Sequence, residues 1–300
     1  MIDLQEASVV HDPTSSPAKP AKPTNPLWHN TKALIGLGMI ALFILVAIIG
    51  PWIERYAPNA EIFIPGQGPS SAHWLGTTAL GQDVWSQLVV GTRVSLLVSF
   101  LAGIVATFIA VLVGIASGYA GGWIDSILSI LTNIFLVIPS LPLVIILSAY
   151  LHLGNWGIIF VIAITSWAWG ARSLRSQALT LVQRDYVVHA KLAGQAWWQV
   201  IFGEILPNMA SLVVSGLLFA MINALLTEAG LDFLGLGNIN AVSWGTMLYW
   251  AQNSEALING MWWWFVPPGV AIAAFGAALS LLNFSLDEIT NPRLRQRKVR

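Results

Sequence analysis

The feature that most constrains this chain is a succession of long apolar runs, which recur from residue 33 almost to the C-terminus. The first run, residues 33–52, contains no charged residue. At about 1.5 Å per helical residue it can cross a hydrocarbon layer of about 30 Å. Further runs occupy approximately residues 94–118, 127–150, 156–171, 209–226 and 263–282. The pattern predicts an all-α polytopic membrane protein with six transmembrane helices.

The composition supports the same class. Of the 300 residues, 56% are hydrophobic and only 9% are charged, which is not typical of a soluble domain. The 14 basic and 14 acidic residues balance, so the charge gives no reason to expect a nucleic-acid partner. Cysteine is absent, which excludes disulfides and thiolate chemistry. No small-residue cleavage site follows the first run, so we expect a retained helix rather than a signal peptide.

The positions of Lys and Arg predict the orientation in the membrane. With six spans, both termini lie on one side, and cytoplasmic loops carry the excess of basic residues. One side would hold Lys19, Lys22, Lys32, Arg172, Arg175, Arg184, Lys191, Arg293, Arg295, Arg297, Lys298 and Arg300. The other side would hold only Arg55 and Arg93. We therefore expect both termini in the cytoplasm, together with the segment between the fourth and fifth spans.

That segment, residues 184–208, is polar and helix-prone, and too charged to lie in hydrocarbon. We expect residues 186–193 to form about two helical turns and residues 197–205 to form a second short helix. Gly194 permits a sharp change of direction between them. Pro207 is expected to separate the second helix from the next span. The segment is thus predicted to be a compact helix-turn-helix at the membrane surface.

The spacing within this segment resembles the EAA loop of ABC importer permeases, E-A-A, three residues, G, nine residues, then I-x-L-P. The matching residues are Ala190, Gly194, Leu206 and Pro207. In that family the loop is a coupling helix that docks into a groove of a separate ATPase subunit. The resemblance implies an ATPase-coupling role for Tyr186, Val188, His189, Ala190, Lys191, Gly194, Leu206 and Pro207.

Three positions in this loop depart from the family pattern. Val188 replaces the glutamate, His189 replaces the first alanine, and Glu204 replaces the isoleucine. For His189 the departure implies either a wider groove in the ATPase or an additional polar contact.

Other strings resemble the dipeptide/oligopeptide branch of the same permeases and occur in the same order. They are H-W-L-G-T-T-A-L-G-Q-D-V at 73–84, Y-A-G-G-W-I-D at 119–125, E-A-G-L-D-F-L-G-L-G at 228–237, S-W-G-T-M-L at 243–248, W-W-W-F-V-P-P-G at 262–269 and N-P-R-L-R at 291–295. Thr78, Gln82 and Asp232 stand where the family has Asp, Arg and Ser. The chain resembles the C-type second permease of such an importer.

The resemblance implies a type I ABC importer permease fold in a prokaryotic cytoplasmic membrane. It implies four partners besides the lipid bilayer: a homologous second permease, two ABC ATPases and an extracytoplasmic substrate-binding protein. ATP and Mg²⁺ would bind to the ATPases, and this chain would carry no cofactor. Such importers carry peptides, oligosaccharides or nickel. We favour peptides, and an oligosaccharide or nickel importer is the alternative within the family.

The sequence offers no catalytic or metal site. It contains no G-x-x-x-x-G-K-[ST] phosphate loop, no G-x-S-x-G elbow and no H-x-x-x-H pair, so enzyme activity is not expected. The alternative class is a secondary transporter or a channel that works alone. Such a carrier usually needs ionisable residues near the middle of the membrane, and the predicted spans contain almost none. The sequence does not identify the residues that line a pathway.

The chain divides into five parts by composition. Residues 1–32, rich in proline, are predicted to be a disordered cytoplasmic tail, 33–53 the first transmembrane helix, 54–90 an extracytoplasmic loop, 91–290 a permease core with five helices and 291–300 a basic cytoplasmic tail. In the second span, a stripe of small residues predicts close helix packing. The stripe consists of Gly103, Ala106, Gly114, Ala116 and Gly118.

Overall fold

The computed structural model describes residues 30–151 and 154–290, and within these ranges it contains helices and no strands. The order is α1 (Thr31–Ile53), α2 (Val84–Ala120), α3 (Gly122–Val137), α4 (Ser140–Leu151), α5 (Gly154–Val182), α6 (Asp185–Leu192), α7 (Trp197–Val200), a π-helical turn (Ile201–Ile205), α8 (Leu206–Phe233), α9 (Trp244–Asn253) and α10 (Trp262–Thr290). The predicted tails, residues 1–29 and 291–300, lie outside the described residues.

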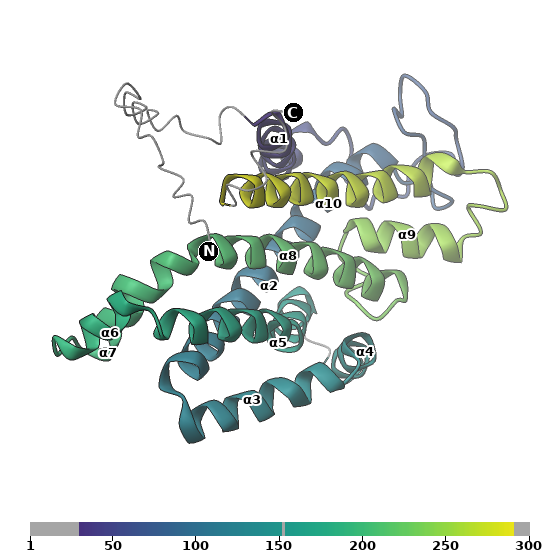
Figure 1. Ribbon diagram of the computed structural model, residues 1–300. Coiled ribbons are helices and arrows are strands. Elements are labelled where there is room, and N and C mark those ends of the chain that lie inside the picture. The colour runs from purple at the N-terminus through teal and green to yellow at the C-terminus, as the bar shows by residue number, and fades with distance from the viewer. Residues whose placement is uncertain (1–29, 152–153, 291–300) are drawn as a thin grey trace, which may run out of the picture.

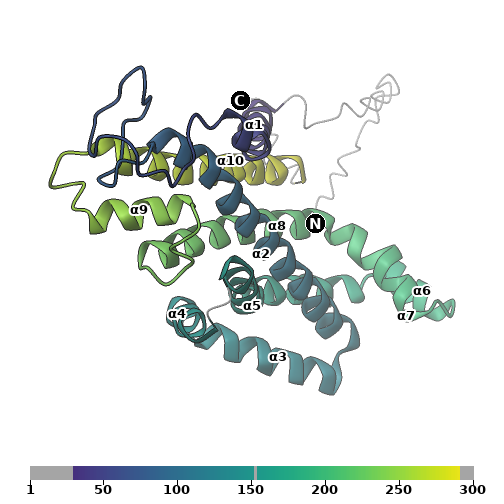
Figure 2. The same ribbon diagram turned by 180° about the vertical axis from the view of Figure 1, so that it is seen from behind.

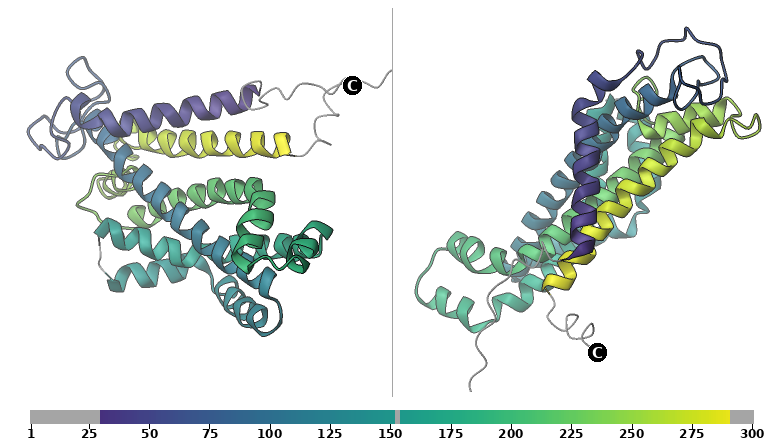
Figure 3. Two further views of the ribbon diagram at one scale, coloured as in Figure 1. Left: turned by 90° about the vertical axis from the view of Figure 1, so that its left-hand side faces the viewer. Right: turned by 90° about the horizontal axis from the view of Figure 1, so that it is seen from above.

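The long helices form a bundle. α1 and α10 lie side by side, and α2 crosses the bundle to pack chiefly against α5 and α8 (Figures 1 and 3). α3 and α4 lie beside α5, away from α1 and α10 (Figure 2). α6 and α7 project at one end, which we call the α6 end. The loop of residues 54–83 and helix α9 lie at the opposite end, the α9 end.

The predicted all-helical membrane fold is confirmed. Five segments are long and apolar enough to cross a bilayer: Thr31–Ile53, Val84–Ala120, Gly154–Val182, Trp197–Phe233 and Trp262–Leu286. α3 and α4 together make a sixth candidate span. Several helices extend beyond the apolar runs, because polar residues at their ends continue the backbone hydrogen bonding once the helix is formed.

The pair α3 and α4 is not a straight helix. The two segments meet at an angle of 86° across a break at residues 138–139. The break follows from Pro139, because the residue before a proline is driven out of the helical region. Ile138 accordingly has an extended conformation, with ψ of 125°. The run 127–150 was predicted to be a single span interrupted by prolines, and Pro139 divides it into two helices.

Small residues allow the backbones of neighbouring helices to approach closely, as predicted for the second span. A Cβ atom on Gly114 would lie 2.6 Å from the Ala171 carbonyl oxygen of α5, and one on Gly118 would lie 2.6 Å from the Ala178 Cβ. Gly103 is packed equally tightly against Met221 of α8. Ala106 is also buried, whereas Ala116 is exposed and lies outside the interface, which corrects the prediction for that residue.

The loop of residues 54–83 is held together by its own polar contacts. His73 Nδ1 lies 2.8 Å from Asp83 Oδ1, and both side chains are buried. Gly76 and Gly81 have φ values of 72° and 74°, which glycine adopts without strain. Trp263 of α10 donates from its indole nitrogen to the carbonyl oxygen of Thr77, at 3.2 Å. The motif at 73–84 thus contains residues that hold the loop in its fold: His73, Gly76, Gly81 and Asp83.

Asp83 also begins α2. Its Oδ2 accepts a hydrogen bond of 2.9 Å from the backbone nitrogen of Ser86, the usual contact of an N-cap residue. The helix therefore starts ten residues before the predicted apolar run, and residues of the assigned loop 54–90 form its first two turns. The boundary of the proposed permease core at residue 91 lies within α2.

The described start of the chain and its described end both lie at the α6 end of the bundle (Figure 3). Lys32 Nζ lies 2.7 Å from Glu288 Oε1, so the first turn of α1 is tied to the last turns of α10. Further along, Gly36 approaches the α10 backbone so closely that a Cβ would lie 2.9 Å from the Ala278 carbonyl oxygen. α1 thus contacts the rest of the bundle along α10 and α2.

Candidate functional site

The segment 184–208 forms the predicted helix-turn-helix. α6 is followed by Gly194 with φ of 76°, which confirms that the turn uses a left-handed conformation. The backbone nitrogens of Gly194 and Gln195 donate to the carbonyl oxygens of Lys191 and Ala190, and these bonds satisfy the last turn of α6. Gln199 then accepts from the Ala196 backbone nitrogen at 2.9 Å, which helps to begin α7.

One side of this helix-turn-helix is part of the protein core. Val187 and Val200 are fully buried, and Ala190 is 8% exposed. They share a cluster with Leu174, Ala178 and Leu181 of α5, Ile115 of α2 and Met209 of α8. The segment is therefore packed against the α6 ends of three long helices, and its position depends on theirs.

The other side is exposed and carries large apolar side chains among polar ones such as Lys191 and Gln195. Trp197 is 63% exposed and Leu192 is 79% exposed. The exposed aromatic, aliphatic and imidazole side chains on this side are Tyr186, Val188, His189, Leu192, Trp197, Trp198 and Phe202. We call them the α6–α7 face. An exposed cluster of large apolar side chains on ordered helices is typical of a surface that binds another protein or a membrane.

The residues predicted to couple to an ATPase fall into two groups in the structure. Ala190 and Leu206 face the protein interior, the first buried and the second half-buried. Tyr186, Val188, His189, Lys191, Gly194 and Pro207 are exposed. The Nζ atom of Lys191 lies 4.5 Å from the ring centroid of Tyr119, in the last turn of α2. Lys191 therefore makes a contact within its own chain, whereas the sequence pattern indicated only a contact with an ATPase.

Pro207 does not separate α7 from the following span, which corrects the sequence-based interpretation. The π-helical turn Ile201–Ile205 leads directly into α8, and Pro207 occupies the first turn of that helix. The π-helical turn accommodates the proline: the Leu206 backbone nitrogen donates to the Ile201 carbonyl oxygen, five residues back, so the missing N–H of Pro207 falls where the regular α-helical bonding is already interrupted. The segment Trp197–Phe233 thus runs as one helical rod from the α6–α7 face through the bundle.

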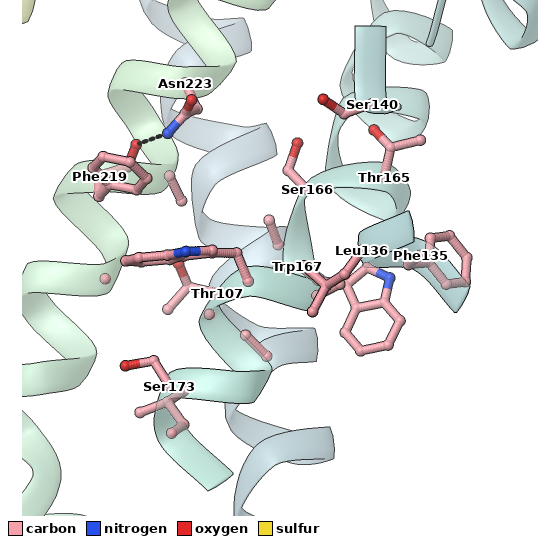
Figure 4. Close-up of a pocket in the computed structure, with 18 of the residues that line it drawn as sticks. Thr107, Phe135, Leu136, Ser140, Thr165, Ser166, Trp167, Ser173, Phe219 and Asn223 are labelled. Carbon is pink, nitrogen blue, oxygen red and sulfur yellow. Dashed lines mark hydrogen bonds between the residues drawn. The ribbon is translucent and has the colours of Figure 1, made fainter. Parts of the chain in front are cut away.

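A hollow of about 510 Å³ opens between α2, α3, α4, α5 and α8, and Asn283 of α10 also lines it. Figure 4 shows Ser140, Thr165 and Ser166 on one side of it and Asn223 on the facing helix. The Asn223 Nδ2 donates to the Phe219 carbonyl oxygen at 3.0 Å (Figure 4). The rings of Trp169 and Phe219 lie 5.0 Å apart, and both line the hollow. None of the described lining side chains is ionisable.

Two carboxylates are buried at the α9 end of α8, which continues to Phe233 beyond the predicted apolar run 209–226. Glu228 and Asp232 lie in the last turns of the helix and are 1% and 3% exposed. Asp232 Oδ2 accepts a hydrogen bond of 2.5 Å from Ser243, the N-cap residue of α9. Gly245 of α9 packs so closely that a Cβ would lie 2.6 Å from the Asp232 Cβ. This cluster joins α8 to α9 and belongs to the framework of the bundle.

Within the described ranges no group of three or more His, Asp or Glu side chains could hold a metal ion. Apolar spans, an uncharged hollow among them and a helical projection between two spans together define a multi-pass α-helical membrane protein of the permease type. The comparisons with known proteins agree. The family described as the inner membrane component of binding-protein-dependent transport systems matches residues 110–296. The N-terminal transmembrane domain of oligopeptide transport permease C matches residues 26–69.

Three relatives illustrate the similarity. A protein of Brucella suis named as a peptide permease is 30% identical over 275 residues, with 91% of each chain covered. The oligopeptide transport system permease protein OppC of Bacillus subtilis is 33% identical over 270 residues, covering 89% of this chain and 87% of its own. A peptide transport system permease protein of Brucella abortus is 32% identical over 276 residues, with 90% of each covered. The chain therefore belongs to the permease subunits of binding-protein-dependent ABC transport systems, in their C-type branch.

Members of this family are transport permease subunits in the inner membrane and are not themselves ATPases. The structure adds features that sequence reasoning missed. The hollow is formed by residues from distant parts of the chain, so no local motif marks it. The ion pair between Asp125 on α3 and Arg175 on α5 was also missed. Asp125 is the last residue of the string at 119–125, and Arg175 was considered only as one of the basic residues that predict orientation.

Proposed function

We propose that this chain is the permease subunit of an ATP-driven importer of peptides. It forms half of the translocation pathway, and a homologous second permease forms the other half. Two ABC ATPases bind on the cytoplasmic side, and an extracytoplasmic binding protein delivers the substrate. ATP and Mg²⁺ bind to the ATPases. Residues 184–208 couple ATP hydrolysis to movement of the transmembrane helices.

The observation that carries this proposal is the two-sided packing of residues 184–208. Val187 and Val200 anchor the segment among α2, α5 and α8, while the α6–α7 face remains free to dock into a groove of another protein. A docking element must be attached rigidly to the part that it moves, because a flexible attachment would absorb the motion. The packing of this segment meets that requirement.

The uncharged hollow supports a role in the pathway. Its hydroxyl and amide groups can exchange hydrogen bonds with a peptide backbone, while its aromatic and aliphatic groups accept side chains of many kinds. A lining without fixed charge neither traps nor repels a substrate by its net charge, which suits peptides of varied sequence. The relatives named as peptide and oligopeptide permeases favour the same substrate class.

We expect the α6 end to face the cytoplasm, because of the basic residues assigned to that side. The chain contains no cysteine, so single cysteines can be introduced at the exposed positions Gln195 and Pro69 without further changes. In intact cells, a membrane-impermeant thiol reagent should label Pro69→Cys and spare Gln195→Cys. Permeabilised cells provide the control, since both positions should then react. The reverse pattern in intact cells would show that the proposed orientation is wrong.

The decisive test of the function is reconstitution. We expect the purified chain alone to hydrolyse no ATP, because it lacks a phosphate-binding loop. Purified from its native membrane, it should carry two ATPase subunits and a second permease. In proteoliposomes, this complex and its binding protein should take up peptides when ATP is supplied, with or without an ion gradient. Uptake driven by a proton or sodium gradient without ATP would instead establish a secondary carrier.

A further inference from the structure

The α6 end of the bundle contains a tight polar contact that links three helices. Arg175 of α5 donates from Nε to Asp125 Oδ1 at 2.6 Å and from Nη2 to Asp125 Oδ2 at 2.7 Å. Ser117 of α2 donates to Asp125 Oδ1 at 2.5 Å, and Ser129 of α3 donates to the same oxygen at 3.2 Å. A bidentate arginine–carboxylate pair fixes the distance and also the relative orientation of the two helices.

The pair is half-buried, with 33% of the Arg175 side chain and 19% of the Asp125 side chain exposed. It is therefore screened less by water and salt than a pair on the surface.

Arg175 lies in the part of α5 that is packed against the helix-turn-helix. The neighbouring residues Leu174 and Ala178 belong to the same cluster as Val187 and Ala190 of α6. Gly114 and Gly118 hold α2 against this stretch of α5 with no space for a side chain. The α6 ends of α2 and α5 and the segment 184–208 thus form one tightly packed unit. Lys191, which lies over the Tyr119 ring, adds a further contact within it.

α3 is attached to this unit much less extensively. Thr132 is the one buried residue of the helix among those described. Its aliphatic side chains at positions 127, 130, 131, 134 and 137 are exposed. On the inward side, the ring of Phe135 lies 5.2 Å from that of Trp167. The contact of Asp125 with Arg175 is therefore the principal polar attachment of α3 to the unit that carries the helix-turn-helix.

The other end of α3 reaches the hollow. Phe135, Leu136, Ile138, Pro139, Ser140 and Leu141 all line it, and they include the break between α3 and α4. Beyond the break, Val144 of α4 packs with Ile158 and Ile162, in the half of α5 far from the helix-turn-helix. The break therefore lies between a helix attached to the α6 end and a helix attached to the α9 end. A displacement of α3 would change the wall of the hollow at this position.

We propose that Asp125 is a positioning residue that makes α3 follow the helix-turn-helix, so that movement of residues 184–208 reaches the hollow at the break between α3 and α4. The inference rests on the proposed function, because it takes those residues as the site of ATPase coupling. It adds a second route to the direct connections of residues 184–208 through α5 and α8.

The test uses a reporter cysteine at Ser140, which is exposed and lines the hollow. In the complete transporter with Ser140→Cys, the rate of labelling by a small thiol reagent should differ at least threefold between the ATP-free state and the state trapped with vanadate. Adding Asp125→Asn or Arg175→Gln should remove most of that difference and lower the peptide transported per ATP hydrolysed. Asp125→Glu and Arg175→Lys, which retain the charges, should preserve most of both.

Ser126→Ala provides the matched control, because Ser126 lies in the same turn and its hydroxyl bonds only to the Gly122 carbonyl oxygen among the described contacts. A merely structural role for Asp125 would lower the yield of complex and leave the response of each assembled molecule unchanged. A normal nucleotide-dependent difference in assembled Asp125→Asn complexes would overturn the proposal, as would no difference in the reporter alone. Failure of the proposed function would be separate, because the ATPases would then not copurify with the chain.

Discussion

Replacing Gly194 by valine is expected to leave the protein in the membrane and to reduce peptide uptake and binding-protein-stimulated ATP hydrolysis together. Gly194 has φ of 76°, and a β-branched residue in this region costs about 1–2 kcal/mol. That energy corresponds to about a 5–30-fold fall in the population of the native turn. The effect is conformational and not steric, since no described atom lies within 4 Å of a Cβ built at this position.

Gly203 offers the matched control. It lies in the π-helical turn of the same segment, is exposed, and also has no described atom within 4 Å of its Cβ position, but its φ is not positive. Gly203→Val should therefore leave uptake close to the wild-type level. Deleting residues 186–193, which removes most of α6, should abolish uptake. If the deletion and Gly194→Val both transport normally, residues 184–208 are not the coupling element.

Replacing Gly114 by valine is expected to disrupt the packing of α2 on α5 and to lower the stability of the whole bundle. A Cβ there would meet the Ala171 carbonyl oxygen at 2.6 Å and the Leu174 Cβ at 2.9 Å. One of these atoms belongs to the backbone, so the helices must separate, and overpacking of this kind costs about 1–3 kcal/mol. Thermal unfolding of the detergent-solubilised protein should show a clear fall in the midpoint.

Gly38 of α1 is a suitable comparison, because it is exposed and nothing described lies within 4 Å of its Cβ position. Gly38→Val should unfold at nearly the wild-type temperature. Gly114→Ala should fall between the two, since it adds the clashing Cβ without the branch. Equal stability of the variants at positions 114 and 38 would show that the α2–α5 approach is not needed.

The apolar runs were sufficient to predict the class of fold, because a helix in hydrocarbon needs only length and the absence of charge. They did not predict where α2 begins, since Gln87 and Arg93 are polar and yet helical. The direction of the turn at Gly194 could be predicted from one residue. The continuity of Trp197–Phe233 could not, because the pattern around Pro207 indicates a break and does not reveal the π-helical turn that precedes it.

The candidate site was likewise predicted only in part from the sequence. The helix-turn-helix is contiguous in the chain, so spacing alone located it, although spacing could not show which residues face inward. The hollow combines residues from Ala106 to Asn283 and exists only once six helices have assembled around it. The contact of Asp125 with Arg175 joins residues 50 positions apart, and neither residue type nor spacing distinguishes it from an exposed pair.

The pairing of α1 with α10 has a consequence for synthesis. Lys32 and Glu288 are separated by 256 positions, so at about 5–20 residues per second α1 leaves the ribosome about 10–50 s before its contact on α10 exists. During that interval α1 has α2 as a neighbour and otherwise faces lipid, which the absence of charge beyond Lys32 permits. A prematurely terminated chain would expose Gly36 and the adjacent face of α1 permanently, and would thereby present an unfinished bundle to the proteases that clear the membrane.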